Sequence, residues 1–190
     1  MVALALVVQL VSSVSGFAQA DTSLSLQRTS FNVARKYVPV RETRGEVDLP
    51  SNLFVSSMYR RRIELMLAHS ATFRRQCVRL ANASNLVVVL QSDTPRSDAE
   101  TRAVTTMVRG DDGGIRAVVR IRQSERVTEL IAHEIEHVIE QLDGVDLKAL
   151  SQQDASGVRR CRCTDVNTFE TQRAVNAGLQ VAREVGDRTH

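Results

Sequence analysis

The sequence predicts a single domain of the α+β class with a small mixed sheet. A long stretch of helical periodicity is followed by three short strand-like runs and then by two further helical stretches, so helices and strands are segregated along the chain. The chain has 190 residues, of which 43% are apolar, and it has no low-complexity tract. That composition suffices for one hydrophobic core of ordinary size.

The first helical stretch follows Pro50. Apolar residues recur at steps of three and four from residue 57 to residue 81, with arginines between them. This period is typical of a helix that buries one face. We therefore expect one long helix that backs the sheet, and a break near His69 and Ser70 stays open.

Three strands are expected next. Residues 86–90 form a short apolar run rich in valine, which indicates a buried strand. Residues 103–109 and 115–121 flank the turn-rich segment 110–114, so they are predicted to pair as a hairpin. Arginines alternate with apolar residues in 115–121, and we interpret this run as a half-exposed strand at the edge of the sheet.

Two helices are expected in the C-terminal part of the chain. The first spans about residues 125–142, with Ser124 as its cap and Gly144 just past its end. Residues 145–167 show little regular pattern and are expected to form a loop. The last helix is expected over residues 168–185.

A metal-binding motif lies in the first of these two helices, where residues 133–137 read His-Glu-Ile-Glu-His. Residues four apart share one face of a helix, about 6 Å apart along its axis. His133 and His137 are therefore placed to converge on one Zn²⁺ ion. Glu134 lies beside the first ligand, where it could accept a proton from a water molecule that the metal activates.

A third ligand is needed, and two carboxylates compete for that position. Asp143 follows His133 by ten residues, but Glu140 stands where a glycine would have to turn the chain back toward the metal. If the helix continues, Asp143 lies about 9 Å past His137 along the axis. Asp143 is therefore better interpreted as part of the helix end.

Glu170, at the start of the expected last helix, is the favoured third ligand. A last helix that crosses the motif helix with its first turn at the metal would bring this carboxylate to the two histidines. Ala174, Ala177 and Gly178 are small enough to allow a close crossing. A carboxylate at a helix N-terminus is also stabilised by the helix dipole.

The order of His133-Glu134-x-x-His137 and a later helix with Glu170 resembles the gluzincin metallopeptidases. The short chain is most similar to their reduced members, the minigluzincins, over the element order of residues 57–185. The resemblance implies a zincin-like fold, a Zn²⁺ cofactor held by His133, His137 and Glu170, and Glu134 as the catalytic base. It also implies that the protein hydrolyses peptide bonds.

Other polar residues near the motif receive simpler interpretations. Ala174 stands where many gluzincins have an aspartate that orients a ligand histidine, so that role is unassigned. Glu136 and Glu140 are expected to be solvated charges on the motif helix. Three residues have the chemistry to stabilise an oxyanion, although each is more simply a packing or surface residue: Tyr59, Arg173 and Asn176.

A peptide or protein substrate is expected, because an extended chain could pair with the predicted edge strand 115–121. Two alternatives stay open, namely a zinc-dependent hydrolase of a non-peptide amide or ester, and a catalytically inactive zincin-like binding domain. Glu134 disfavours the inactive domain, because structure alone does not need a carboxylate there. Nucleic acid is not an expected partner, since the basic clusters are scattered and only 4% of the residues are aromatic.

The N-terminal residues have the pattern of an export signal. Residues 2–10 are almost wholly apolar, and residues 18–20 read Ala-Gln-Ala, the small-x-small pattern of a signal-peptidase site. We expect a signal peptide over 1–20, an irregular segment over 21–50 and a zincin-like metallohydrolase domain over 51–190. The mature protein would be periplasmic or secreted, with no stable membrane span after cleavage.

The chain contains three cysteines. An oxidising compartment favours disulfides, and cysteines separated by a single residue rarely bridge. We therefore expect Cys77 to form a disulfide with Cys161 or Cys163.

Overall fold

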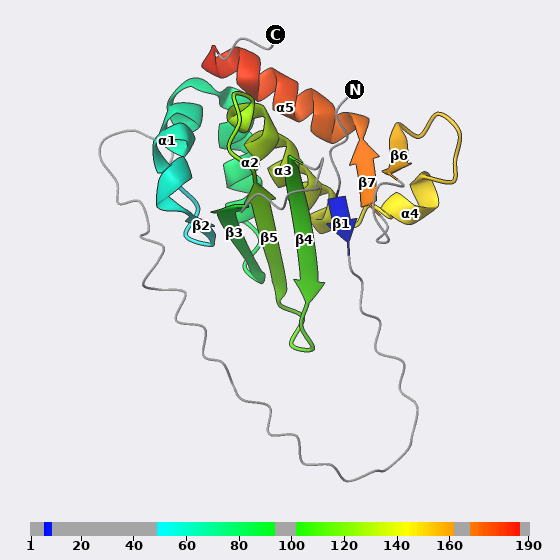
Figure 1. The fold of residues 1–190 in the computed structure, drawn as a ribbon. Helices are drawn as coiled ribbons and strands as arrows, with labels where there is room; N and C mark the ends of the chain where they lie inside the picture. Colours follow the sequence, from blue (N-terminus) through cyan, green and yellow to red (C-terminus); the bar gives the residue numbers. More distant parts are fainter. Residues whose placement is uncertain (1–5, 9–48, 94–101, 162–167, 187–190) are drawn as a thin grey trace.

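The structure of the protein is a computed structural model that describes residues 6–8, 49–93, 102–161 and 168–186. It has one mixed sheet with helices gathered over one face (Figure 1). The predicted α+β class is therefore confirmed.

The strands, in chain order, are β1 (Leu6–Val8), β2 (Leu53–Val55), β3 (Leu86–Ser92), β4 (Ala103–Arg109), β5 (Ile115–Ile121), β6 (Val158–Cys161) and β7 (Thr168–Thr171). In space their order is β2-β3-β5-β4-β1-β7-β6. The pairs β2–β3, β3–β5 and β1–β4 are parallel, whereas β4–β5, β1–β7 and β6–β7 are antiparallel.

The predicted hairpin is confirmed, but the predicted edge position of residues 115–121 is wrong. β4 pairs with β5 so that Ala103 lies opposite Ile121 and Arg109 opposite Ile115. However, β5 also pairs with β3 along its whole length, so it is an interior strand. The alternation of arginines indicated only that one face of the strand is more exposed. It did not indicate whether another strand pairs with each edge.

The helices are α1 (Arg60–His69), α2 (Ala71–Ala81), α3 (Val127–Leu142), α4 (Leu147–Leu150) and α5 (Gln172–Val185), with a 3₁₀ turn at Ser57–Tyr59. The expected long helix is thus divided at Ser70, where the break had been left open. Ser70 has extended backbone angles, and its Oγ accepts a hydrogen bond from the amide of Phe73 at 3.0 Å. This N-cap begins α2.

The motif helix, α3, ends as predicted but begins differently. Its first residue is Val127, and Arg126 precedes it without a side-chain capping bond, so the predicted Ser124 cap is wrong. Gly144 follows the helix with a φ of 73°, a left-handed conformation that glycine adopts readily.

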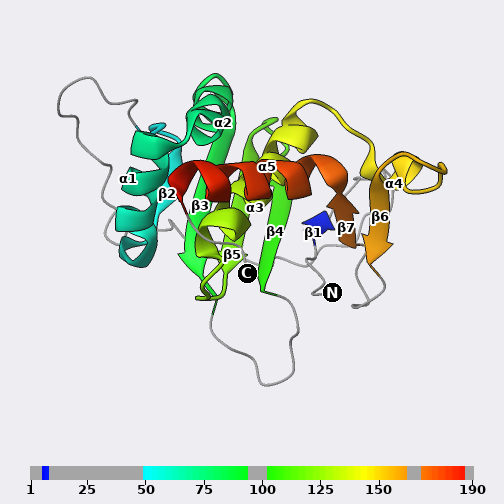
Figure 2. The ribbon, with the colours of Figure 1, turned by 90° about the horizontal axis from the view of Figure 1, so that it is seen from above.

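α3 lies between the sheet and α5, as Figures 1 and 2 show from two directions. Every residue from Val127 to Glu140 is buried. One side of the helix contacts β4 through Thr105, and another contacts α5 at Gly178. The histidines and glutamates of α3 are therefore enclosed in protein, where polar groups need partners.

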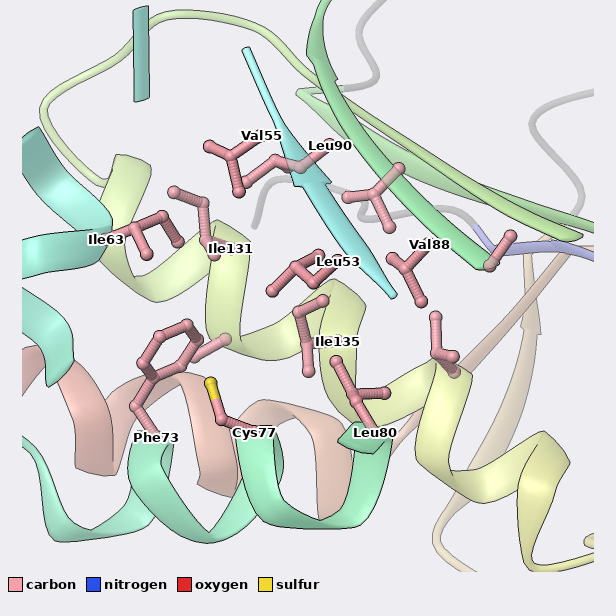
Figure 3. Packing of buried hydrophobic residues seen from close by; sticks show 14 of the residues in the cluster. Leu53, Val55, Ile63, Phe73, Cys77, Leu80, Val88, Leu90, Ile131 and Ile135 are labelled. Atoms are coloured by element: carbon pink, nitrogen blue, oxygen red, sulfur yellow. The ribbon is translucent and has the colours of Figure 1, made fainter. Parts of the chain in front are cut away.

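An aliphatic core fills the space between the sheet and the helices (Figure 3). Side chains of β2, β3, α2 and α3 meet there, among them Val55, Val88, Leu90, Phe73, Leu80, Ile131 and Ile135. Each large apolar side chain contributes about 1.5–3 kcal/mol when it is fully buried. This packing holds α3, and with it the motif, in one position.

Cys77 is a free thiol in this core, so the predicted disulfide between Cys77 and either other cysteine is wrong. The residue is 1% exposed, and burial raises the pKa of its thiol to about 12. Its position on α2 beside Phe73 and Leu80 fits a small apolar side chain. The sequence showed the spacing of the cysteines but not that Cys77 faces inward.

The predicted signal peptide lies mostly outside the described residues, as does residue range 21–48. Within it the structure describes β1, in which Val7 lies opposite Thr106 of β4 on one side and Thr168 of β7 on the other. Export stays a prediction. Among the described helices, none is long and apolar enough to cross a membrane.

Glu184 of α5 ties that helix to the break between α1 and α2. Its carboxylate accepts hydrogen bonds from the hydroxyls of Ser70 and Thr72 and from the amide of Thr72. Burial opposes ionisation of Glu184, but these bonds and one from Gln180 outweigh it and lower its pKa to about 2. The ionised carboxylate therefore stabilises the folded chain.

Glu184→Gln should lower the free energy of unfolding at neutral pH by about 1–2 kcal/mol, because hydrogen bonds to a charged group are replaced by neutral ones. The folded-state pKa lies below the ordinary value of 4.5, so this stabilisation is complete above pH 4.5 and is lost as the pH falls toward 2. Urea unfolding of parent and variant between pH 7 and pH 2 measures the difference. A gap that stays constant over that range would contradict this origin of the stability.

Candidate metal centre

Three side chains from two elements converge on one point. His133 and His137 lie one turn apart on α3, and their Nε2 atoms are 3.1 Å apart. Glu170 comes from β7, and its Oε1 atom lies 3.1 Å from His133 Nε2 and 3.9 Å from His137 Nε2. As the sequence predicted, these three residues form a group that could hold a metal ion.

Glu170 lies on a strand, so the prediction that the C-terminal helix carries the third ligand is wrong. It belongs to β7 and stands opposite Arg159 of β6. α5 begins only at Gln172, and Thr171 caps it by accepting a hydrogen bond from the amide of Ala174 at 3.0 Å. A threonine at each end of the four-residue strand favours extended backbone before the cap.

The expected close crossing of the two helices is confirmed at Gly178. A Cβ atom at this position would lie 2.8 Å from the carbonyl oxygen of Glu129 and 3.2 Å from Cβ of His133. Ala174, one turn earlier on α5, is completely buried. These small residues set the distance between the helix that carries the histidines and the helix that follows Glu170.

Gly178→Ala should lower the free energy of unfolding by about 1–3 kcal/mol, because the added methyl group meets a backbone oxygen that cannot easily move. The resulting displacement of α5 should also weaken metal binding, because α5 continues directly from β7, the strand that carries Glu170. Asn176→Ala, on the exposed face of the same helix, is the matched control and should change neither property appreciably. Chemical denaturation and metal titration of both variants test this, and a fully stable Gly178→Ala would refute the close crossing.

Asp143, the competing carboxylate, does not reach the histidines. It caps the C-terminus of α3 and forms ion pairs with Arg79 and with Arg173, the second at 2.9 Å. Burial opposes ionisation of Asp143, but the hydrogen bonds from Arg173 and Arg79 outweigh it and hold its pKa below the ordinary value.

Glu134 is completely buried beside the two histidines. Its Oε2 atom accepts a hydrogen bond of 2.6 Å from the hydroxyl of Thr105 on β4. Its Oε1 atom is buried and, among the described residues, has no hydrogen-bond partner. Thr105 therefore holds one oxygen of the carboxylate and leaves the other available as a hydrogen-bond acceptor.

The charges of the site act on one another. Burial raises the pKa of Glu134 above its ordinary value, although the nearby histidines and the Thr105 hydroxyl act in the opposite direction. Burial disfavours the charged form of His133, but its hydrogen bond to Glu170 and the charges of Glu134, Glu170 and Glu129 outweigh that and raise its pKa. The shift of His133 shows that the surrounding carboxylates favour a positive charge on this histidine.

The expectation that Glu136 and Glu140 are solvated charges is wrong, since they are only 8% and 2% exposed. Glu136 bonds Gln76 and Arg173, both at 2.7 Å. Glu140 lies 2.8 Å from His137 Nδ1. A glutamate three residues after a ligand histidine shares its helix face, and this spacing is the signal that could have identified Glu140.

None of the three candidate oxyanion residues lies at the site. The Tyr59 hydroxyl donates to the carbonyl oxygen of Ile121 at 2.6 Å, deep in the core. Arg173 is engaged with Glu136 and Asp143. Asn176 is exposed and bonds Gln172 on the same helix. The simpler interpretations of these residues therefore hold.

A scan against protein-family models and searches of curated proteins and of solved structures found no match for this chain. The interpretation of the site therefore rests on its own geometry and chemistry.

Proposed function

We propose that the protein is a zinc-dependent metallopeptidase with a zincin-like fold, similar in its ligand set to the gluzincins. The convergence of His133, His137 and Glu170 beside the buried carboxylate of Glu134 carries this proposal. A metal site with a purely structural role would not need a buried carboxylate with one oxygen unengaged. That carboxylate is the group a hydrolase requires.

The donor set fits zinc. Nitrogen and oxygen ligands at about 2.0–2.1 Å from a tetrahedral Zn²⁺ ion lie roughly 3.3 Å from one another, and the three measured separations are 3.1, 3.1 and 3.9 Å. Two histidines and one glutamate leave the fourth position for water or substrate. The histidine side chains are 2% and 1% exposed, whereas that of Glu170 is 22% exposed, so Glu170 is the ligand with the most contact with solvent.

A zinc ion held here would supply a Lewis acid that lowers the pKa of water and polarises a carbonyl group. Glu134 would accept a proton from the attacking water through its unengaged Oε1 and then donate it to the leaving amine. Thr105 would keep the other oxygen of Glu134 in place throughout. Burial raises the pKa of Glu134 above its ordinary value, which favours the uptake of a proton by this carboxylate.

An extended peptide is the substrate that the sheet supports best. The position beside β4 is taken by β1, a strand that pairs with β4 on one side and β7 on the other. β4 carries Thr105, which contacts the proposed base, and β7 carries Glu170. β1 shows that an extended chain can pair with both elements of the site. β1 belongs to the predicted signal peptide, so we propose that a substrate peptide takes this position once residues 1–20 are removed, which favours a peptide over a compact substrate.

The test uses the purified chain with and without residues 1–20, each loaded with zinc, and a peptide library whose cleavage products are identified by mass spectrometry. We expect cleavage that a chelator abolishes and added Zn²⁺ restores. His137→Ala should be inactive, while His69→Ala, which alters an exposed histidine on α1, should keep the parental activity. Intact peptides after incubation with zinc-loaded protein would contradict the proposed function.

A further inference from the structure

Glu140 connects the two elements that carry the metal site, and the proposed reaction uses it in no step. Its Oε2 atom lies 2.8 Å from Nδ1 of His137. Its Oε1 atom accepts a hydrogen bond of 2.7 Å from the hydroxyl of Thr171, the residue next to Glu170. Glu140 and Thr171 are 2% and 3% exposed, so water does not compete for these bonds.

The hydrogen bonds among Thr171, Glu140 and His137 indicate which atom carries each proton. The Thr171 oxygen already accepts the amide proton of Ala174, so its own proton points to Glu140. An ionised carboxylate can only accept hydrogen bonds. In the tautomer that suits this acceptor, Nδ1 of His137 carries the proton, and Nε2, with a free electron pair, faces His133 and Glu170.

We propose that Glu140 is a positioning residue for the metal ligand His137 and that Thr171 holds Glu140 in place. The carboxylate selects the tautomer of His137 that can bind a metal and fixes the plane of its ring. Through Thr171, the same contact links the histidine helix to the junction of β7 and α5, so both parts of the ligand set keep one relative position. This inference rests on the metal site of the proposed function, but not on its peptidase activity.

The first measurement is the zinc affinity of the full chain, by competition with a chromogenic chelator. Glu140→Gln and Thr171→Val should each bind Zn²⁺ about 10–100-fold more weakly, as is usual when the partner of a ligand histidine is lost. Thr171→Ser keeps the hydroxyl and should retain the parental affinity for Zn²⁺. Glu136→Gln makes the same change in another buried carboxylate of α3 and should leave the affinity unchanged.

The second measurement is the tautomer of His137 in the metal-free chain, by NMR of ¹⁵N-labelled histidine, with His137→Ala to assign the signal. The parent should show Nδ1–H. Glu140→Gln should populate Nε2–H, because the amide can donate to Nδ1. A purely structural role would lower the melting temperature and move neither readout.

Parental zinc affinity and an unchanged tautomer in Glu140→Gln would overturn the inference, and so would a parent chain that does not bind zinc. If Glu140→Gln does not fold, Thr171→Val compared with Thr171→Ser decides the question by the same two readouts. If the parent binds zinc and the variants lose affinity, but no peptide is cleaved, the proposed function fails while this inference stands.

Discussion

Glu134→Gln is expected to lower peptide hydrolysis by about 10²–10⁴-fold, the usual contribution of a positioned general base, while zinc stays bound. Glutamine has nearly the shape of glutamate, and its oxygen can still accept the Thr105 hydrogen bond that now holds Oε2 at 2.6 Å. The variant therefore removes the basic oxygen without opening a cavity. Steady-state kinetics on a cleaved library peptide, with elemental analysis of the same sample, measure both properties.

Glu136→Gln is the matched control for this change. It makes the same substitution two residues further along α3, where the carboxylate bonds Gln76 and Arg173 instead of facing the histidines. Its hydrolysis rate should stay close to that of the parent. If Glu134→Gln cleaves as fast as Glu136→Gln, Glu134 is not the base and the proposed mechanism loses its central residue.

Glu170→Ala should weaken zinc binding by more than the roughly 10–100-fold typical of a lost partner of a ligand, because it removes one of three direct donors. Asp143→Ala should leave zinc binding nearly unchanged. Its carboxylate bonds Arg79 and Arg173, which leave it outside the metal group. The two variants remove the same chemical group, so their comparison separates a ligand from a nearby charge.

Competition with a chromogenic chelator gives both zinc affinities, and thermal unfolding monitors the fold. Asp143→Ala loses partly exposed ion pairs and should lower stability by no more than about 1 kcal/mol. Weaker zinc binding in Asp143→Ala than in Glu170→Ala would identify Asp143, and not Glu170, as the third metal ligand. It would also contradict the arrangement of β7 against α3 described above.

A large part of the metal group was predictable from the sequence, because a helix determines the spacing of its own side chains. His133 and His137 share a face of α3 whatever surrounds that helix, and Glu134 follows from their spacing. The exclusion of Asp143 needed only the rise of the helix per residue. The hairpin of β4 and β5 was likewise predictable, because its turn and its two strands are adjacent in the chain.

What lies around those residues was decided by the tertiary structure. Glu140 has the charge of a surface residue, and Thr171, on a strand distant in the sequence, gives it a buried partner in addition to His137 on its own helix. Thr105 meets Glu134 because β4 packs beneath α3, and no local pattern signals that contact. Cys77 gave a spacing that suggested a disulfide, whereas the packing of α2 placed it in the core.

The sequence by itself determined the class of the fold and the pair of histidines with its glutamate, because each depends on contacts within one helix or between neighbouring segments. The tertiary structure alone decided that β5 is an interior strand, that Glu170 reaches the histidines from a strand, and that Thr171 bonds Glu140. The physical reason is that strand neighbours and buried hydrogen bonds join residues far apart in the chain. Their partners are set by packing over the whole domain, which a local pattern does not report.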